Sequence, residues 1–152
     1  LVGAILFGGL GAGVASSMVE AKQPIDIGEL VMRKFVDRTP QEIPNWPAMN
    51  VEEQPSREEY STSGTLLEFR VTLFDLNDVN GLTSNIITTM KDSEGNVLWK
   101  KGFLYYSRKF ERKRSIDEFQ AENGKLLKEE MEFAADKTVS DFIEHFKKGG
   151  RE

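Results

Sequence analysis

Residues 66–76 read LLEFRVTLFDL. They begin a longer stretch, residues 66–146, that decides the fold. Apolar and polar side chains alternate in residues 66–76: Leu67, Phe69, Val71 and Leu73 against Glu68, Arg70 and Thr72. Because successive side chains on a strand point to opposite faces, this pattern predicts a strand with one apolar face. Leu66, Phe74 and Leu76 interrupt the alternation near its ends.

Two more strands follow. Asn80-Gly81 is a strong turn signal, and the β-branched residues of 82–91 suit a pleated surface. Gly95, within Asp92–Asn96, permits a hairpin loop because glycine adopts positive φ without steric cost. After it, Trp99, Phe103 and Tyr105 share one side of a third strand. The sequence predicts an antiparallel meander over 64–107.

Helices are predicted over 116–147. Ser115 and Glu118 have the spacing of a capping box, and Asn123-Gly124 interrupts the first short helix. From Lys125 onward, apolar side chains recur every three or four residues: Leu127, Met131, Ala134, Ala135, Thr138, Val139, Phe142, Ile143 and Phe146. Such a stripe packs against a sheet or another helix. The predicted class is α+β: an antiparallel β-meander of three to four strands with helices packed on one face.

The N-terminal third predicts a helix over 25–38 with Asp26 as its N-cap and Pro40 and Pro44 at its end. A turn at Asn45-Trp46-Pro47, a short strand over 48–52 and a polar loop over 54–64 follow. We expect residues 1–152 to form a single domain.

Residues 1–19 are apolar and rich in glycine and alanine, and three interpretations are open. They are a helix packed within the domain, a membrane helix with Gly9 and Gly13 on its packing face, or the end of a secretory signal cleaved near Gly13-Val14-Ala15.

Composition excludes several functions. The net charge of −5 argues against general binding of nucleic acid, and the absence of cysteine excludes disulfides, thiolate metal sites and cysteine nucleophiles. The sequence has no Gly-x-Ser-x-Gly, phosphate loop or dinucleotide fingerprint. We predict no catalytic residues and no cofactor.

Two segments invite a metal or catalytic interpretation. Asp75–Gly81 resembles a calcium loop, but Val79, Asn80 and Ile86 occupy positions that need a ligand, a glycine and a glutamate. A turn with Asx hydrogen bonds is predicted instead. His145 is the sole histidine, and a position near a helix C-terminus suits it. We therefore predict no metal site.

The sharpest electrostatic feature is a basic cluster at the end of the meander: Lys100, Lys101, Arg108, Lys109, Arg112, Lys113 and Arg114. One interpretation is a solvated connection between strand and helix. The other is a contact surface for an envelope protein, an anionic lipid or a glycan.

The order of these elements resembles that of poorly characterised bacterial envelope lipoproteins. Such proteins often carry an Asp-x-x-Gly-x-Val-Leu-Trp hairpin, here Asp92, Gly95, Val97, Leu98 and Trp99, followed by a helix with an Ala-Ala pair, here Ala134 and Ala135. The resemblance implies a periplasm-facing α+β domain, tethered by lipid, with a binding or scaffolding role. This chain lacks a lipidation cysteine, so such an anchor would lie upstream of Leu1.

The leading hypothesis is thus a non-enzymatic cell-envelope protein, periplasmic or membrane-tethered, that acts as a binding or assembly module. One alternative is a membrane-associated homo-oligomer that packs through residues 1–19. Another is a small-ligand carrier or an enzyme with a carboxylate cleft.

Overall fold

A computed structural model describes residues 3–8, 26–44, 49–53 and 66–149. In chain order its elements are β1 (Gly3–Gly8), α1 (Ile27–Glu42), β2 (Met49–Glu53), β3 (Leu66–Asn77), β4 (Gly81–Lys91), β5 (Val97–Tyr106), the 3₁₀ helix η2 (Ser107–Phe110) and α2 (Ile116–Lys147). The segments Asn45-Trp46-Pro47 and 54–64, predicted as a turn and a loop, lie outside the described residues.

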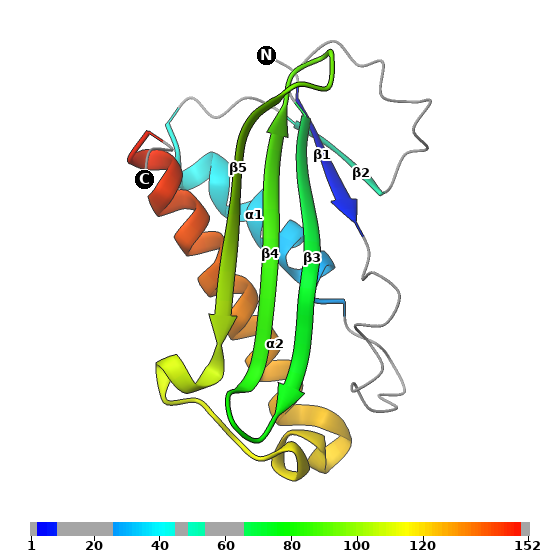
Figure 1. The fold of residues 1–152 in the computed structure, drawn as a ribbon, viewed down its shortest axis with the longest axis vertical. Coiled ribbons are helices and arrows are strands. Elements are labelled where there is room, and N and C mark those ends of the chain that lie inside the picture. Colours follow the sequence, from blue (N-terminus) through cyan, green and yellow to red (C-terminus); the bar gives the residue numbers. More distant parts are fainter. Residues whose placement is uncertain (1–2, 9–25, 45–48, 54–65, 150–152) are drawn as a thin grey trace.

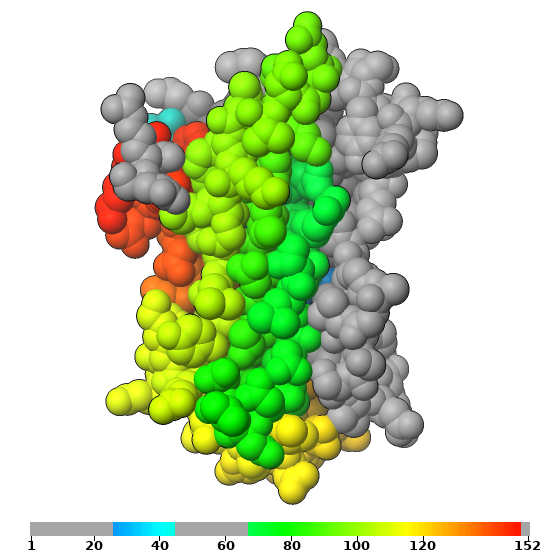
Figure 2. All heavy atoms as spheres, viewed as in Figure 1, coloured from blue at the N-terminus to red at the C-terminus, as the bar shows by residue number. Residues whose placement is uncertain are grey.

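The strands form one sheet in the order β2-β1-β3-β4-β5 (Figure 1). β3, β4 and β5 are the predicted antiparallel meander, whereas β1 pairs in parallel with both β2 and β3. Both helices lie behind the sheet in Figure 1, and Figure 2 shows the opposite face, where β3, β4 and β5 lie at the surface. The predicted α+β class, a meander with helices on one face, is confirmed, and two parallel strands extend the sheet beyond the meander.

The structure corrects the interpretation of the N-terminal segment. Residues 3–8 are a strand between β2 and β3, so the two helical interpretations of 1–19 are wrong for these residues. Residues 9–19 lie outside the described part of the chain. No helix among the described residues is long and apolar enough to cross a membrane.

A β-bulge in β3 explains why its alternation breaks. The pairing with β4 shifts register between Val71 and Leu73, so that Thr72 is the extra residue. Leu67, Phe69 and Val71 therefore face the core, as predicted, but Leu73 is 39% exposed while Phe74 and Leu76 are buried. The prediction that Leu73 faces inward is wrong, because one extra residue moves every later side chain to the other face.

Helix α1 begins where the sequence predicts and ends later. The Asp26 carboxylate accepts a hydrogen bond from the Gly28 backbone N–H at 2.9 Å, as expected of an N-cap. The helix then passes through Pro40 to Glu42 instead of ending at Arg38. Proline in the last turn deprives only the Val36 carbonyl of its donor, and Ile43 N–H still closes the helix on Thr39 O at 2.9 Å.

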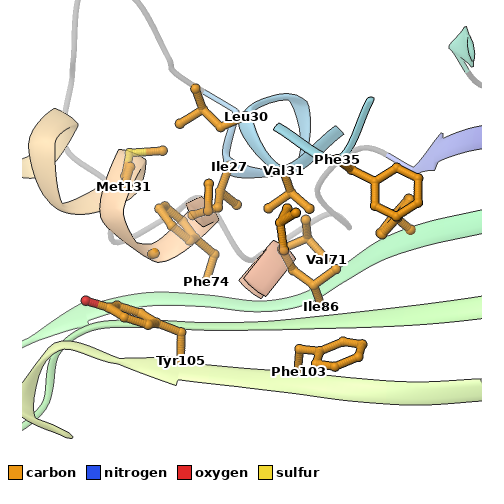
Figure 3. Packing of buried hydrophobic residues seen from close by; sticks show 14 of the residues in the cluster. Ile27, Leu30, Val31, Phe35, Val71, Phe74, Ile86, Phe103, Tyr105 and Met131 are labelled. Carbon is orange, nitrogen blue, oxygen red and sulfur yellow. The ribbon is translucent and has the colours of Figure 1, made fainter. Parts of the chain in front are cut away.

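Aromatic side chains from three elements meet between the helices and the sheet. The Phe35 ring lies 4.9 Å from that of Phe69 and 5.0 Å from that of Phe142, both edge-on. Figure 3 shows Ile27 and Val31 of α1 pointing down to the sheet, and Phe74 and Tyr105 pointing up from it. Lys34 and Arg38 also link α1 to α2, through ion pairs with Glu132 and Asp136.

Helix α2 has the predicted cap and interruption. Ser115 Oγ accepts from the Glu118 N–H at 3.1 Å, and the Glu118 carboxylate accepts from the Ser115 N–H at 2.8 Å. Glu122, Asn123 and Gly124 adopt left-handed backbone angles and separate a short first part from the long second part. Met131 and Phe142 of the apolar stripe are buried against the sheet.

Candidate functional site

The structure divides the seven predicted basic residues among three environments. Lys100 and Lys101 lie on β5 and, being adjacent on a strand, point to opposite faces of the sheet. Arg112 contacts a buried carboxylate. The remaining four are exposed around η2 and the approach to α2, and we call them the cationic end: Arg108, Lys109, Lys113 and Arg114.

Backbone hydrogen bonds fix the cationic end to the β3–β4 turn. Arg108 N–H donates to Asn80 O at 3.0 Å, and Ile116 N–H donates to Asp78 Oδ1 at 2.9 Å. Gly81, with φ of +74°, lies so close that an added Cβ would sit 2.9 Å from Ser107 Cβ. The exposed cations are therefore carried on an ordered turn, close to the lower end of the molecule in Figure 1.

None of the four side chains of the cationic end forms an ion pair within the described residues. Lys113 and Arg114 border a hollow of about 630 Å³ that also contains Asp78, Asp117 and Glu118. Two of these carboxylates already accept backbone hydrogen bonds, from Ile116 and Ser115. The bonds from Ser115 hold the pKa of Glu118 below its usual value of 4.5. The hollow is thus of mixed charge, and its two cations, Lys113 and Arg114, form no ion pair within 4 Å among the described residues.

Arg112 belongs to a buried polar network centred on Glu130, which is only 3% exposed. Arg112 Nε donates to Glu130 Oε2 at 2.8 Å, and Ser107 Oγ donates to Oε1 at 2.8 Å. The Tyr105 hydroxyl also donates to Oε1, and burial, followed by the neighbouring carboxylate, raises the pKa of Tyr105. Three donors satisfy this carboxylate, so the network joins β5, η2 and α2 as a structural unit.

Glu130 is not among the predicted site residues, although the sequence carries a signal for it. Glu130 is three residues after Leu127 and four before Ala134, so it lies on the apolar stripe of α2. A charged residue at such a position needs a buried partner. Its neighbours Lys128, Glu129 and Glu132 are charged as well, which hides the anomaly in the sequence.

The Asp75–Gly81 segment is the turn that the sequence predicts. Asn77 Oδ1 accepts from the Val79 and Asn80 N–H groups at 3.0 and 2.8 Å, which is an Asx turn. Among the described residues, no three His, Asp or Glu side chains are placed to hold a metal ion.

A second hollow, of about 300 Å³, lies between β5 and the C-terminal turns of α2, and we call it the β5 groove. It is lined by Lys101, Gly102, Phe103, Leu104, Asp141, Glu144, His145 and Lys148. The His145 ring lies 5.5 Å from that of Trp99 and 6.4 Å from that of Phe103, so the histidine packs in an aromatic cluster. Glu144 pairs with Lys148 at 2.6 Å and Asp141 with Lys137 at 3.7 Å, whereas Lys101 has no ion pair among the described residues.

Comparison with known proteins shows the fold alone. No family model matches this sequence, and no curated protein matches it. A solved structure that it does resemble is the crystal structure of a Xanthomonas campestris protein with the family model DUF330. The TM-score is 0.55 at 11% identity, over 93% of this chain and 80% of that one. The chain is therefore similar in fold to an uncharacterised bacterial protein.

Proposed function

We propose that this chain is a non-enzymatic protein of the bacterial cell envelope, a binding or assembly module of the lipoprotein type that faces the periplasm. The observation that carries the proposal is the cationic end, where Arg108, Lys109, Lys113 and Arg114 are exposed and, among the described residues, without an ion pair. In a chain of net charge −5 such a group favours an anionic partner: an envelope protein, an anionic lipid or a glycan.

The buried polar groups support a binding role over catalysis. Glu130 is the one buried carboxylate among the described residues, and Arg112, Ser107 and Tyr105 already occupy its oxygens. A general acid or base needs a free oxygen that can reach a substrate. The carboxylate-cleft hypothesis requires two buried, facing carboxylates in one pocket, whereas Asp78, Asp117 and Glu118, which share the hollow beside the cationic end, are all exposed.

The cationic end can be tested with vesicles, provided that Arg112 is left intact. The variant K113E/R114E reverses two exposed charges, and K147E/K148E reverses two at the C-terminal end of α2. We expect the full chain to co-sediment with phosphatidylglycerol vesicles and to release them as salt is raised, because exposed charges are screened. K113E/R114E should bind at least several-fold more weakly than K147E/K148E. Equal binding by the two variants would remove the cationic end as the contact surface.

Localisation has its own test. The genomic start of the open reading frame should encode a signal sequence that ends in a cysteine upstream of Leu1. Fractionation of the producing bacterium should place the protein with the envelope. A start codon immediately before Leu1, together with recovery from the cytoplasmic fraction, would contradict the envelope assignment.

A further inference from the structure

We propose that the free edge of β5 is a strand-addition site, and that its ligand is an extended, acidic segment of a partner protein. The site is separate from the cationic end, so either proposal can fail alone. Its central relationship is that an unpaired strand edge and a helical wall meet at the β5 groove, where Lys101 has no ion pair among the described residues, while Lys100 lies on the other face of the same edge strand.

The first observation is the edge itself. β5 is the last strand of the sheet, and its outer edge pairs with none of the described strands. Its pairing with β4 shifts register at Leu98, and residues 99–106 then form a regular edge, whereas edge strands are commonly very short or interrupted by proline. Its backbone N–H and C=O groups on that side form a row of donors and acceptors. An extended chain can complete such a row by main-chain hydrogen bonds.

The second observation is the side-chain pattern of β5 on its open face. Leu104 is 55% exposed and lies on the same face as Lys100, and Leu98, which is 57% exposed, is the extra residue of the bulge. Lys101 points to the other face, into the β5 groove. Neither lysine has an ion pair among the described residues. A strand opposite β5 would therefore be favoured by apolar residues facing the leucines and carboxylates facing the lysines.

The third observation argues against a second copy of this chain as the ligand. The antiparallel pairing of two β5 strands that sets Leu98 opposite Leu104 also sets Lys101 opposite Lys101, and directly opposed like charges are destabilising. In addition, the C-terminal turns of α2 lie outside β5 in Figure 1. A two-fold-related copy would bring its own α2 into that space. A single extended segment brings no helix of its own and so avoids this conflict.

The residues of the groove define the ligand further. Asp141 and Glu144 on the helical wall are each paired with a lysine, so they leave Lys101 as the cation available to the ligand. In an antiparallel strand, consecutive carboxylates would face Lys101 and then Lys100. A leucine placed three residues before this pair would face Leu104, and one placed two residues after it would lie beside Leu98 at the bulge.

A synthetic peptide with this pattern tests the proposal. The probe is acetyl-Thr-Leu-Thr-Thr-Glu-Glu-Thr-Leu-Thr-amide, and its control has two lysines in place of the glutamates. We expect the acidic peptide to bind the full chain about tenfold more tightly than the control. We also expect hydrogen exchange to slow at β5 amides on the free edge when the acidic peptide binds, because these amides gain acceptors.

Charge exchange provides the sharpest comparison. K100E/K101E should lose the acidic peptide and gain the lysine peptide, which restores the pairing with the signs reversed. The matched variant K125E/K128E reverses two exposed lysines on α2 that do not line the groove, and it should behave as the parent does. Circular dichroism confirms that each variant is folded.

Three outcomes would overturn the proposal. The two peptides could bind K100E/K101E and the parent alike, the bound peptide could protect amides outside β5, or the free-edge amides of β5 could already be protected in the chain without peptide. The last result would mean that another part of the same chain occupies the edge. Loss of vesicle binding in K113E/R114E is independent of all three.

Discussion

Arg112 Nε donates a hydrogen bond to Glu130 Oε2 at 2.8 Å, and the same guanidinium lies 4.1 Å from the centre of the Phe133 ring. The contact ties the segment after η2 to the middle of α2. The sequence predicts Arg112 as part of a contact surface, but the structure gives it a structural role. A substitution at Arg112 would disturb the buried network around Glu130.

Replacing Arg112 by alanine should therefore lower the free energy of unfolding by roughly 1.5–3 kcal/mol, the usual contribution of a hydrogen bond to a charged group. Arg112→Lys should lose less, since it keeps the charge but not the planar contact with Phe133. Urea unfolding followed by tryptophan fluorescence measures both. Arg114→Ala is the control, because Arg114 is exposed. A loss for Arg114→Ala equal to that of Arg112→Ala would contradict the assignment.

Thr88 offers a stabilising substitution. It is fully buried on β4, and its hydroxyl has no hydrogen-bond partner in the described structure. Thr88→Val keeps the shape and removes an unsatisfied polar group, so we expect a gain of about 1 kcal/mol in the free energy of unfolding. Thr72→Val is the matched control, because Thr72 Oγ1 accepts from Asn85 Nδ2 at 2.8 Å and should lose stability when replaced. A destabilised T88V protein would show that the Thr88 hydroxyl is satisfied in solution.

The bulge in β3 predicts opposite effects at neighbouring positions. Phe74→Ala should lower the free energy of unfolding by about 3–5 kcal/mol, since it empties a site in the core. Leu73→Ser should change it by no more than about 0.5 kcal/mol, since Leu73 faces outward. Thermal unfolding by circular dichroism compares the two. If Leu73→Ser proved to be the more damaging change, the register shift would be misplaced.

The capping box of α2 makes stability depend on pH. Hydrogen bonds from Ser115 keep the pKa of Glu118 below its usual 4.5, so the folded protein binds that proton less readily than the unfolded chain does. The contribution is present above the unfolded pKa and is lost as the pH falls through the folded pKa. Glu118→Gln should therefore differ most from the parent above the usual pKa of 4.5 and converge with it as the pH falls below that value. A difference that stayed constant across this range would show that the charge of Glu118 is not the cause.

The cap itself can be separated from this charge. Ser115→Ala removes the oxygen that accepts from the Glu118 N–H at 3.1 Å, and an N-cap substitution of this kind costs about 1 kcal/mol. Ser115→Asp should retain most of the stability, because aspartate also caps helices well. Chemical unfolding at neutral pH distinguishes the two variants, and equal losses would show that the capping oxygen contributes little.

The meander and the divided C-terminal helix could be predicted because local rules determine them. The hairpin glycine, the Ser115–Glu118 spacing and the break before Lys125 each act within a few residues. The bulge at Thr72 has no comparable signal, since both registers of β3 present apolar residues and the pairing with β4 decides between them.

The strand at residues 3–8 could not be predicted from local rules. A short apolar segment rich in glycine and alanine fits either a helix or a buried strand, and its place between β2 and β3 depends on partners far away in the chain. The seven basic residues could be identified from the sequence, but their distribution among three environments could not. The contact that sets Arg112 apart depends on Glu130, which is 18 residues away.

The position of β1 has a consequence for how the chain assembles. β1 leaves the ribosome before its neighbours, yet β3 is more than fifty residues further along, and among the described strands β2 reaches the sheet through β1 alone. We therefore expect the two parallel strands to join after the meander offers a template, because closing so long a loop slows folding. Removing the first eight residues would therefore delete β1 and also detach β2 from the sheet. It would leave one edge of β3 unpaired, and such an edge promotes aggregation.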